Sequence, residues 1–135
     1  MYRSNLTTKG KVLEDLSKSI KTAKILPLLR FKRYIYEYDK DNVVNNIQRN
    51  FKENLLIIRS AANNEDNEDS SNAGHYKSIL NIPRLDKIKL IEAIDNVISS
   101  YDSKDSNNEI FVQPMLSNIK LSGVVFTADI DTLSP

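Results

Sequence analysis

The sequence has no cysteine, no tryptophan and only one histidine among its 135 residues. Without cysteine, the chain can form neither disulfide bonds nor zinc sites made of thiolates. A single histidine also excludes the metal sites that several histidines build together. Any metal ion that this chain binds must therefore be held by oxygen ligands.

An excess of charge of one sign is also missing, because 19 Lys and Arg are balanced by 18 Asp and Glu, for a net charge of +1. The chain therefore has no overall field that would attract nucleic acid or an anionic membrane. No apolar run approaches the roughly 20 residues that span a bilayer, and the N-terminus has no apolar signal core. We expect a soluble, cytoplasmic chain with the length of one domain.

Glycine is scarce as well, with three residues in the whole chain: Gly10, Gly74 and Gly123. In a chain with so few glycines, each one is expected where a Cβ atom would meet a close neighbour or where the backbone has a special geometry. All three lie in or beside segments that also carry candidate functional residues.

The spacing of apolar residues predicts an α+β fold. Three segments with apolar residues every three or four positions are expected to be helices: 11–20, 41–51 (with Asp41 or Asn42 as its N-cap) and 85–101. Four segments rich in apolar and β-branched residues are expected to be strands: 54–60, 75–82, 110–116 and 119–130. Residues 23–39 contain Pro27 and are expected to be extended at an edge or surface. Because helices and strands do not alternate regularly, we expect a mixed or antiparallel sheet with about three helices.

Arg59 ends an apolar strand, where its guanidinium group must find acceptors, and its planar set of donors suits a phosphate or a carboxylate. The alternative is an ion pair with Glu65 or Asp66 that holds the following loop. Lys9 lies just before the first helix, where it could offer a point charge to a phosphate near the helix N-terminus. Alternatively, Lys9 is an ordinary exposed lysine, since the P-loop pattern is absent.

The loop after Arg59 carries four carboxylates, Glu65, Asp66, Glu68 and Asp69, which could bind a hard cation or form a solvated acidic loop. His75 is the sole histidine, but a lone histidine in a loop more often bonds to the backbone, so we assign it no chemistry. Gln113 lies in an apolar strand and could meet the edge of a base, or it could simply be the outward polar residue of a core strand.

Several motifs together resemble a known family. Residues 58–66 read IRSAANNED and are followed by Ser71, Ala73 and Gly74; residues 112–116 read VQPML; residues 122–129 read SGVVFTAD; and residues 8–13 read TKGKVL. In this order, they resemble the signature segments of the pyruvate phosphate dikinase and phosphoenolpyruvate synthase family, in its N-terminal nucleotide-binding domain of ATP-grasp type. The four matches extend across nearly the whole chain.

The resemblance implies roles for individual residues. Lys9 would contact the nucleotide phosphates, and Arg59 would contact the phosphoryl group that is transferred. Val112, Gln113 and Met115 lie in the segment that resembles the hinge along the adenine pocket. The implied cofactors are ATP and Mg²⁺, with the metal ligands expected mainly outside this chain.

The sequence also departs from the family pattern. Ala61 stands where most members have a second serine, and His75 stands where many have glutamine. Residues 128–130 read ADI where many members have Arg-Asp-Pro, and the family's phosphohistidine and acceptor domains have no counterpart. We therefore expect residues 1–135 to form a single partial ATP-grasp domain, inactive alone.

For the whole enzyme, the resemblance implies transfer of phosphate from ATP through a phosphohistidine to a small acceptor, pyruvate by family default. The alternatives are a related kinase of another small metabolite, such as glutamine in capsule pathways, or a non-catalytic interaction module that kept the fold. We further expect the chain to pair with the remaining portion of the enzyme or to self-associate, because half of a cleft leaves apolar surface exposed.

Overall fold

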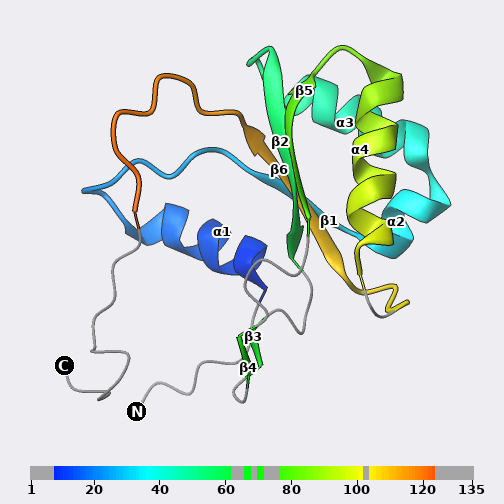
Figure 1. The fold of residues 1–135 in the computed structure, drawn as a ribbon, viewed down its shortest axis with the longest axis horizontal. Coiled ribbons are helices and arrows are strands. Elements are labelled where there is room, and N and C mark those ends of the chain that lie inside the picture. The colour runs from blue at the N-terminus through cyan, green and yellow to red at the C-terminus, as the bar shows by residue number, and fades with distance from the viewer. Residues whose placement is uncertain (1–7, 62–65, 68–69, 72–76, 102–103, 124–135) are drawn as a thin grey trace.

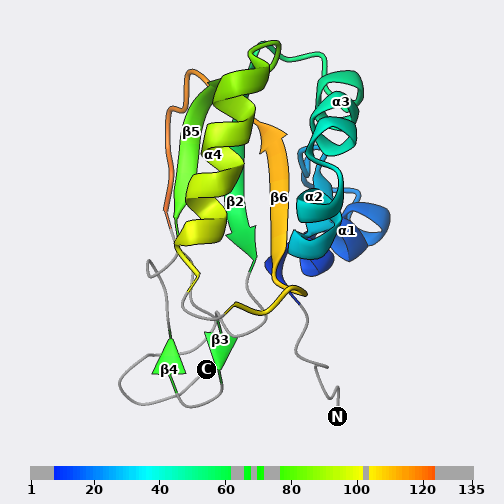
Figure 2. The ribbon, with the colours of Figure 1, turned by 90° about the vertical axis from the view of Figure 1, so that its right-hand side faces the viewer.

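The computed structural model describes residues 8–61, 66–67, 70–71, 77–101 and 104–123. Within these residues, a four-stranded antiparallel sheet lies between two layers of helices (Figure 1). The first helix, α1, lies against one face of the sheet, and α2, α3 and α4 cover the other, as Figure 1 shows. Figure 2 looks from the side on which α4 lies in front of the strands. The α+β fold predicted from the sequence is thus confirmed, and its sheet is antiparallel.

The strand order in the main sheet is β1-β6-β2-β5, so β1 and β5 are its edges. Its strands are β1 (Leu29–Lys32), β2 (Leu55–Ala61), β5 (Ser78–Pro83) and β6 (Glu109–Pro114). Two very short strands, β3 (Asp66–Asn67) and β4 (Ser70–Ser71), form a separate pair. The central strands β2 and β6 are paired from Leu56↔Pro114 to Ala61↔Glu109.

The four helices of the described residues begin at side-chain caps in three cases. They are α1 (Lys9–Ser19), α2 (Arg33–Tyr38), α3 (Lys40–Asn50) and α4 (Lys87–Ser99). Thr8, Asp39 and Asp86 accept a backbone N–H in the first turns of α1, α3 and α4. Such caps are typical because a helix leaves its first N–H groups without a partner within the helix.

The hydrophobic core lies between the sheet and the three helices α2, α3 and α4. Ile58 of β2 and Val112 of β6 are fully buried there, together with Val44, Ile47 and Ile94 from the helices. Since side chains alternate along a strand, the residues next to Ile58 and Val112 face the opposite side, which α1 partly covers. We call this second side of the sheet the α1 face.

Most of the predicted elements are present within two or three residues of the expected bounds, but three expectations were wrong. Residues 33–38, expected to be extended, form α2, and the preceding β1 is an edge strand. The N-cap of α3 is Asp39 and neither Asp41 nor Asn42. In the segment expected to be a strand over 119–130, residues 119–123 form none, and the rest lies outside the described residues.

The apolar stripe predicted on the first helix is only partly buried. Leu13 is half-buried, Leu16 and Ile20 are each 37% exposed, and Gly10 is the buried residue of α1. The helix itself is confirmed, but it is attached to the sheet by its N-terminal end and by polar contacts.

Candidate functional site

Arg59 lies near the end of β2 on the α1 face, where its guanidinium carbon is 5.3 Å from the centre of the Phe111 ring. The two residues are directly paired across β2 and β6, and Phe111 is almost fully buried. A guanidinium group that lies on an aromatic face keeps its donors in the plane free to meet oxygen acceptors. Among the carboxylates whose side chains the structure describes, none forms an ion pair with Arg59. The side chains of Glu65 and Asp66, the alternative partners expected from the sequence, lie outside that set.

The N-terminal end of α1 meets the same aromatic ring. A Cβ atom placed on Gly10 would lie 3.7 Å from the Phe111 side chain and 3.4 Å from Cδ of Arg30. These are ordinary contact distances, so a Cβ atom would fit at Gly10, and one at Gly123 would meet nothing within 4 Å. The expectation that these glycines avoid a close neighbour is therefore not met at either position. Lys9, its exposed neighbour, belongs to the segment that reaches the α1 face, so the structure brings the start of α1 and Arg59 to one side of the sheet. The roles of Lys9 and Arg59 stay predictions.

A buried carboxylate joins α1 to the sheet next to this ring. Glu109, the first residue of β6, is 6% exposed. Its Oε2 accepts a hydrogen bond from the Thr8 hydroxyl at 2.6 Å, and its Oε1 accepts one from a terminal nitrogen of Arg30 at 2.9 Å. Arg30 also donates from Nε to Glu14 of α1 at 2.7 Å. The positive charge of Arg30 is thus matched by two carboxylates.

These contacts change the proton affinity of two groups. Burial works against the charge of Arg30, but its hydrogen bonds and ion pairs with Glu14 and Glu109 outweigh burial, so the pKa of Arg30 is raised. The hydrogen bond and the positive charge of Arg30 hold the pKa of Glu14 below its ordinary value. Both shifts favour the charged forms of Arg30 and Glu14.

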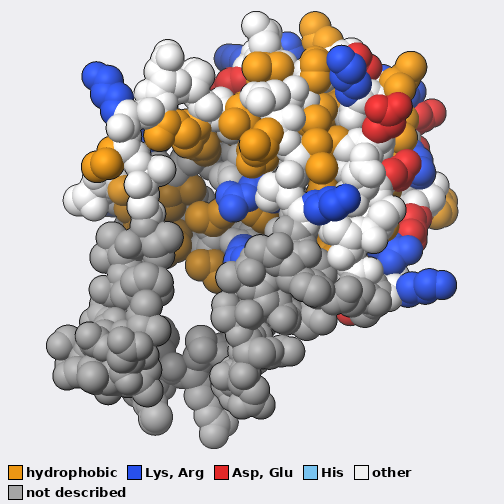
Figure 3. All heavy atoms as spheres, viewed as in Figure 1, with side chains coloured by type: hydrophobic (Ala, Val, Ile, Leu, Met, Phe, Trp, Pro, Cys, Tyr) orange, Lys and Arg blue, Asp and Glu red, His pale blue; other side chains and the backbone are white. Residues whose placement is uncertain are grey.

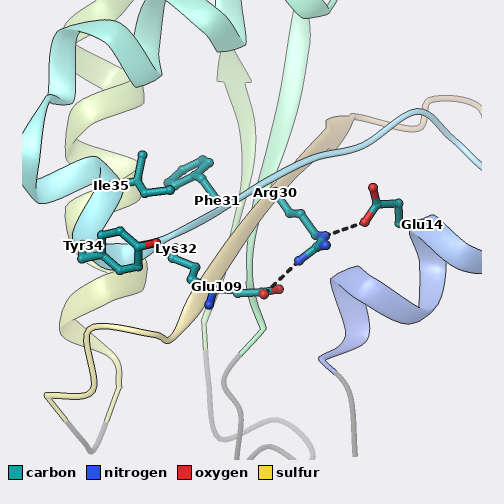
Figure 4. Close-up of a pocket in the computed structure, with 7 residues that line it drawn as sticks. All are labelled: Glu14, Arg30, Phe31, Lys32, Tyr34, Ile35 and Glu109. Carbon is teal, nitrogen blue, oxygen red and sulfur yellow. Dashed lines mark hydrogen bonds and ion pairs between the residues drawn. The ribbon is translucent and has the colours of Figure 1, made fainter. Parts of the chain in front are cut away.

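A hollow of about 280 Å³ lies beside this network, at the β1 edge of the sheet (Figure 4). Glu14, Arg30 and Glu109 lie along one side of it, and residues around the start of α2 line the rest. Arg59 of β2 does not line this hollow, which lies beside β1 and the start of β6. The two features are therefore different places on the molecule.

Tyr101, which follows α4, fixes the ends of the two central strands. Its hydroxyl accepts a hydrogen bond from the backbone N–H of Ala61 at 3.3 Å and donates one to the backbone carbonyl of Glu109. The hydroxyl is buried, and both backbone groups belong to the part of the sheet next to Arg59. Tyr101 thus holds β2 and β6 together where the candidate site lies.

The three residues expected along the adenine pocket do not share one face of the sheet. Gln113 has the same strand parity as Phe111 and lies on the α1 face, opposite Ile57 of β2. The side chain of Val112 lies in the core with the helices, so only its backbone could line a pocket. Met115 follows β6, and its backbone N–H donates to the carbonyl of Leu55 at 3.0 Å.

The space-filling view shows a hollowed surface on the side of the molecule that faces the reader, with hydrophobic side chains around it and Lys or Arg side chains among them (Figure 3). Such a mixture of apolar and basic groups suits a ligand with a planar base and phosphates better than it suits a wholly apolar ligand.

Some of the predicted features lie outside the described residues. They include His75, Gly74 and the side chains of the acidic loop after Arg59. In the part of the chain that the structure describes, no group of three or more histidines or carboxylates could hold a metal ion. None of the helices described there is long and apolar enough to cross a membrane.

Sequence reasoning missed four residues of this region: Thr8, Arg30, Phe111 and Glu109. A threonine directly before a helix is an N-cap signal, so Thr8 could have been noticed. Glu109, a carboxylate at the start of an otherwise apolar strand, was also a signal for a buried and paired charge. The partners of Arg30 and Phe111 come from distant segments, so no local pattern indicates them.

Comparison with known proteins identifies the family. A family model described as the pyruvate phosphate dikinase AMP/ATP-binding domain matches residues 39–134. This range includes Arg59, Gln113 and Met115, whereas Lys9 lies before it. Comparisons with curated proteins and with solved structures give no match. Because the family model covers well over half of the chain, the protein belongs to the family of pyruvate phosphate dikinase AMP/ATP-binding domains.

Proposed function

We propose that this chain is the N-terminal ATP-binding fragment of a phosphotransferase like phosphoenolpyruvate synthase or pyruvate phosphate dikinase, with an ATP-grasp type of fold. The observation that carries the proposal is the position of Arg59, which lies on Phe111 and has no carboxylate partner among the side chains that the structure describes. A guanidinium group held in this way can offer paired donors to a phosphate.

Phosphoryl transfer needs mainly positioning and positive charge around the oxygens of the transferred group. In the proposed site, Arg59 supplies a planar set of donors, and Lys9 supplies a compact charge at the positive end of α1. The N-terminal end of α1 packs on the ring that supports Arg59, which is the arrangement that one phosphate chain would need.

The base would lie along the segment that follows these phosphates on β6. Gln113 faces the α1 side and can both donate and accept hydrogen bonds. Met115 follows the strand end, and Val112 would contribute through its backbone. Mg²⁺ belongs to the proposal for the whole enzyme. The described residues hold no cluster of three or more histidines or carboxylates that could bind it.

In the whole enzyme, phosphate would pass from ATP through a histidine to a small acceptor, for which the family default is pyruvate. This histidine is not His75, which lies in a segment that resembles part of the nucleotide domain. The proposal therefore specifies the acceptor only as a small metabolite.

The test is a calorimetric titration of the chain with ATP, with and without Mg²⁺. We expect Arg59→Ala and Lys9→Ala each to weaken ATP binding by about tenfold or more, as the loss of a charge-assisted contact predicts. Matched controls are Arg49→Ala and Lys24→Ala, which remove exposed basic residues elsewhere, and these should leave the dissociation constant unchanged.

Wild-type affinity in both the Lys9 and the Arg59 variants would reject their roles. A wild-type chain that ignores ATP but binds a protein partner stably would favour the non-catalytic interaction module instead.

A further inference from the structure

The N-terminal end of α1 is fixed to the sheet mainly at Glu109. Among the residues of α1, Gly10 is the buried one, Leu13 is half-buried, and Val12 and Leu16 are 43% and 37% exposed. Apolar burial therefore holds this helix less firmly than it holds the helices of the core. Its attachment depends also on the contact of Gly10 with Phe111 and Arg30 and on the hydrogen bonds to Glu109 and Arg30.

We propose that Glu109 is a positioning residue that holds the start of α1, and with it Lys9, against the face of the sheet that carries Arg59. This inference rests on the proposed nucleotide function, because it assigns Lys9 to the phosphates. Glu109 itself would not touch the nucleotide. It acts through Thr8, which directly precedes Lys9. Glu109 accepts a hydrogen bond from the Thr8 hydroxyl at 2.6 Å.

The geometry of Glu109 suits a fixed anchor. Its two carboxylate oxygens have different partners, Thr8 of the α1 cap and Arg30 of β1. Its backbone carbonyl accepts a hydrogen bond from the Tyr101 hydroxyl. Its backbone is also paired with that of Ala61 at the end of β2. A buried carboxylate with partners on several elements has little freedom to move, so it can define where α1 begins.

The charge of Glu109 also fixes the direction of the hydrogen bond from Thr8. A carboxylate only accepts, so the Thr8 hydroxyl must donate to it, and the oxygen lone pairs of Thr8 remain available to the N–H of Lys11 at 3.3 Å. In Glu109→Gln, the amide oxygen can still accept from Arg30, but the new NH₂ group then faces Thr8 and must donate to its hydroxyl, which loses a charged acceptor. This variant keeps the shape of the side chain and removes the charge that strengthens both contacts.

The experiment combines hydrogen exchange with ligand titration on the full chain. We expect Glu109→Gln to speed the exchange of backbone amides at the start of α1. It should weaken ATP binding about tenfold while changing adenosine binding less than about twofold, since adenosine has no phosphates for Lys9 to meet. The matched control is Asp15→Asn, which removes an exposed carboxylate of α1 that pairs with Lys11 of the same helix.

A double-mutant cycle distinguishes positioning from a general loss of structure. If Glu109 acts through Lys9, then Glu109→Gln should change ATP affinity less than about twofold when Lys9 is already alanine. Equal weakening in both backgrounds would overturn the proposal, and so would unchanged exchange in α1.

A second pair of variants guards against misfolding of Glu109→Gln. Thr8→Val removes the hydroxyl that reaches Glu109 and should reproduce the loss of ATP affinity, and Thr8→Ser should restore it. Failure of the proposed function gives a different result: Lys9→Ala then leaves ATP binding unchanged, while exchange in α1 still decides whether Glu109 holds the helix.

Discussion

Arg30 and Arg59 lie on the same face of the sheet, but their surroundings differ. Arg30 is paired with two carboxylates, and these ion pairs raise its pKa against the effect of burial. Arg59 lies on an aromatic ring. An arginine whose charge is already matched serves to join elements, whereas one supported by a ring can meet an external anion. This difference separates a structural arginine from a candidate binding residue.

Tyr101 gives a prediction at the residue scale. Tyr101→Phe removes the hydroxyl that accepts a hydrogen bond from the Ala61 N–H and donates one to the Glu109 carbonyl. These buried backbone groups then lack that partner. We expect the free energy of unfolding to fall by about 1–3 kcal/mol. Urea unfolding measures this as a lower midpoint with an unchanged slope.

The control for this experiment is Tyr38→Phe, since Tyr38 is 92% exposed and its loss of a hydroxyl should not change the midpoint. If both variants unfold at the same urea concentration as the wild type, Tyr101 does not clamp the strands.

At the scale of the elements, three helices meet at Asp95 of α4. Its carboxylate accepts a hydrogen bond from the Tyr36 hydroxyl of α2 at 3.0 Å and pairs with Lys40 of α3 at 3.1 Å. The ammonium group of Lys40 also lies 5.0 Å from the centre of the Tyr36 ring. The short helix α2 is therefore held by contacts with both of its neighbours in the layer.

This junction gives a prediction about pH. Burial, followed by the hydrogen bond and charge of Asp95, raises the pKa of Tyr36 above its ordinary value. The folded state therefore holds this proton more tightly than the unfolded chain. Tyr36 contributes this stability fully below the tyrosine pKa of about 10 in the unfolded chain, and the contribution is lost as the pH rises further.

The measurement is the unfolding free energy of wild type and Tyr36→Phe at a series of alkaline pH values. Stability of the wild type should fall more steeply above about pH 10, because the phenylalanine variant has no proton to lose at this position. Parallel curves for the two proteins would contradict the prediction.

The sequence predicted elements best where one apolar pattern was long. Helix α4 was predicted from an apolar pattern that includes Ile94 and Val97, which are fully buried, although Ile88 of the same pattern is 70% exposed. Helix α2 was missed because its six residues combine aromatic and β-branched side chains, which favour strands. Its helical form depends on tertiary contacts of Tyr36 with α4, which a local pattern does not contain.

For the candidate site, too, the sequence indicated what depends on a local motif and missed what depends on contacts between distant segments. The motif around Arg59 indicated a binding residue, and the family match agrees with the resemblance on which that inference was based. The support of Arg59 by Phe111 and the attachment of α1 by Glu109 depend on pairings between segments far apart in the sequence. Such pairings are set by the register of the sheet, which the single sequence does not specify.

On the scale of the whole molecule, the two faces of the sheet are covered unequally. Three helices bury the core face, whereas the other face is met by α1 near β6 and β1. On the β2 and β5 side, Leu55 and Leu80 are 42% and 52% exposed. Leu80 lies at a bulge in β5, where Asn81 has a positive φ of 56°. Asparagine tolerates this backbone conformation better than most residues do.

These exposed residues bear on the prediction of self-association. Ile88, at the start of α4 on the core-face side of the sheet, is a further exposed apolar side chain, at 70%. Burial of such surface favours association, so we expect sedimentation velocity to show oligomers whose share grows with concentration.

Leu80→Thr combined with Ile88→Gln should shift the chain toward monomer. Tyr38→Ser should not, because it removes an exposed aromatic residue from α2, next to the opposite edge strand β1. A strictly monomeric wild-type profile at every concentration would show that this exposed apolar surface does not drive association.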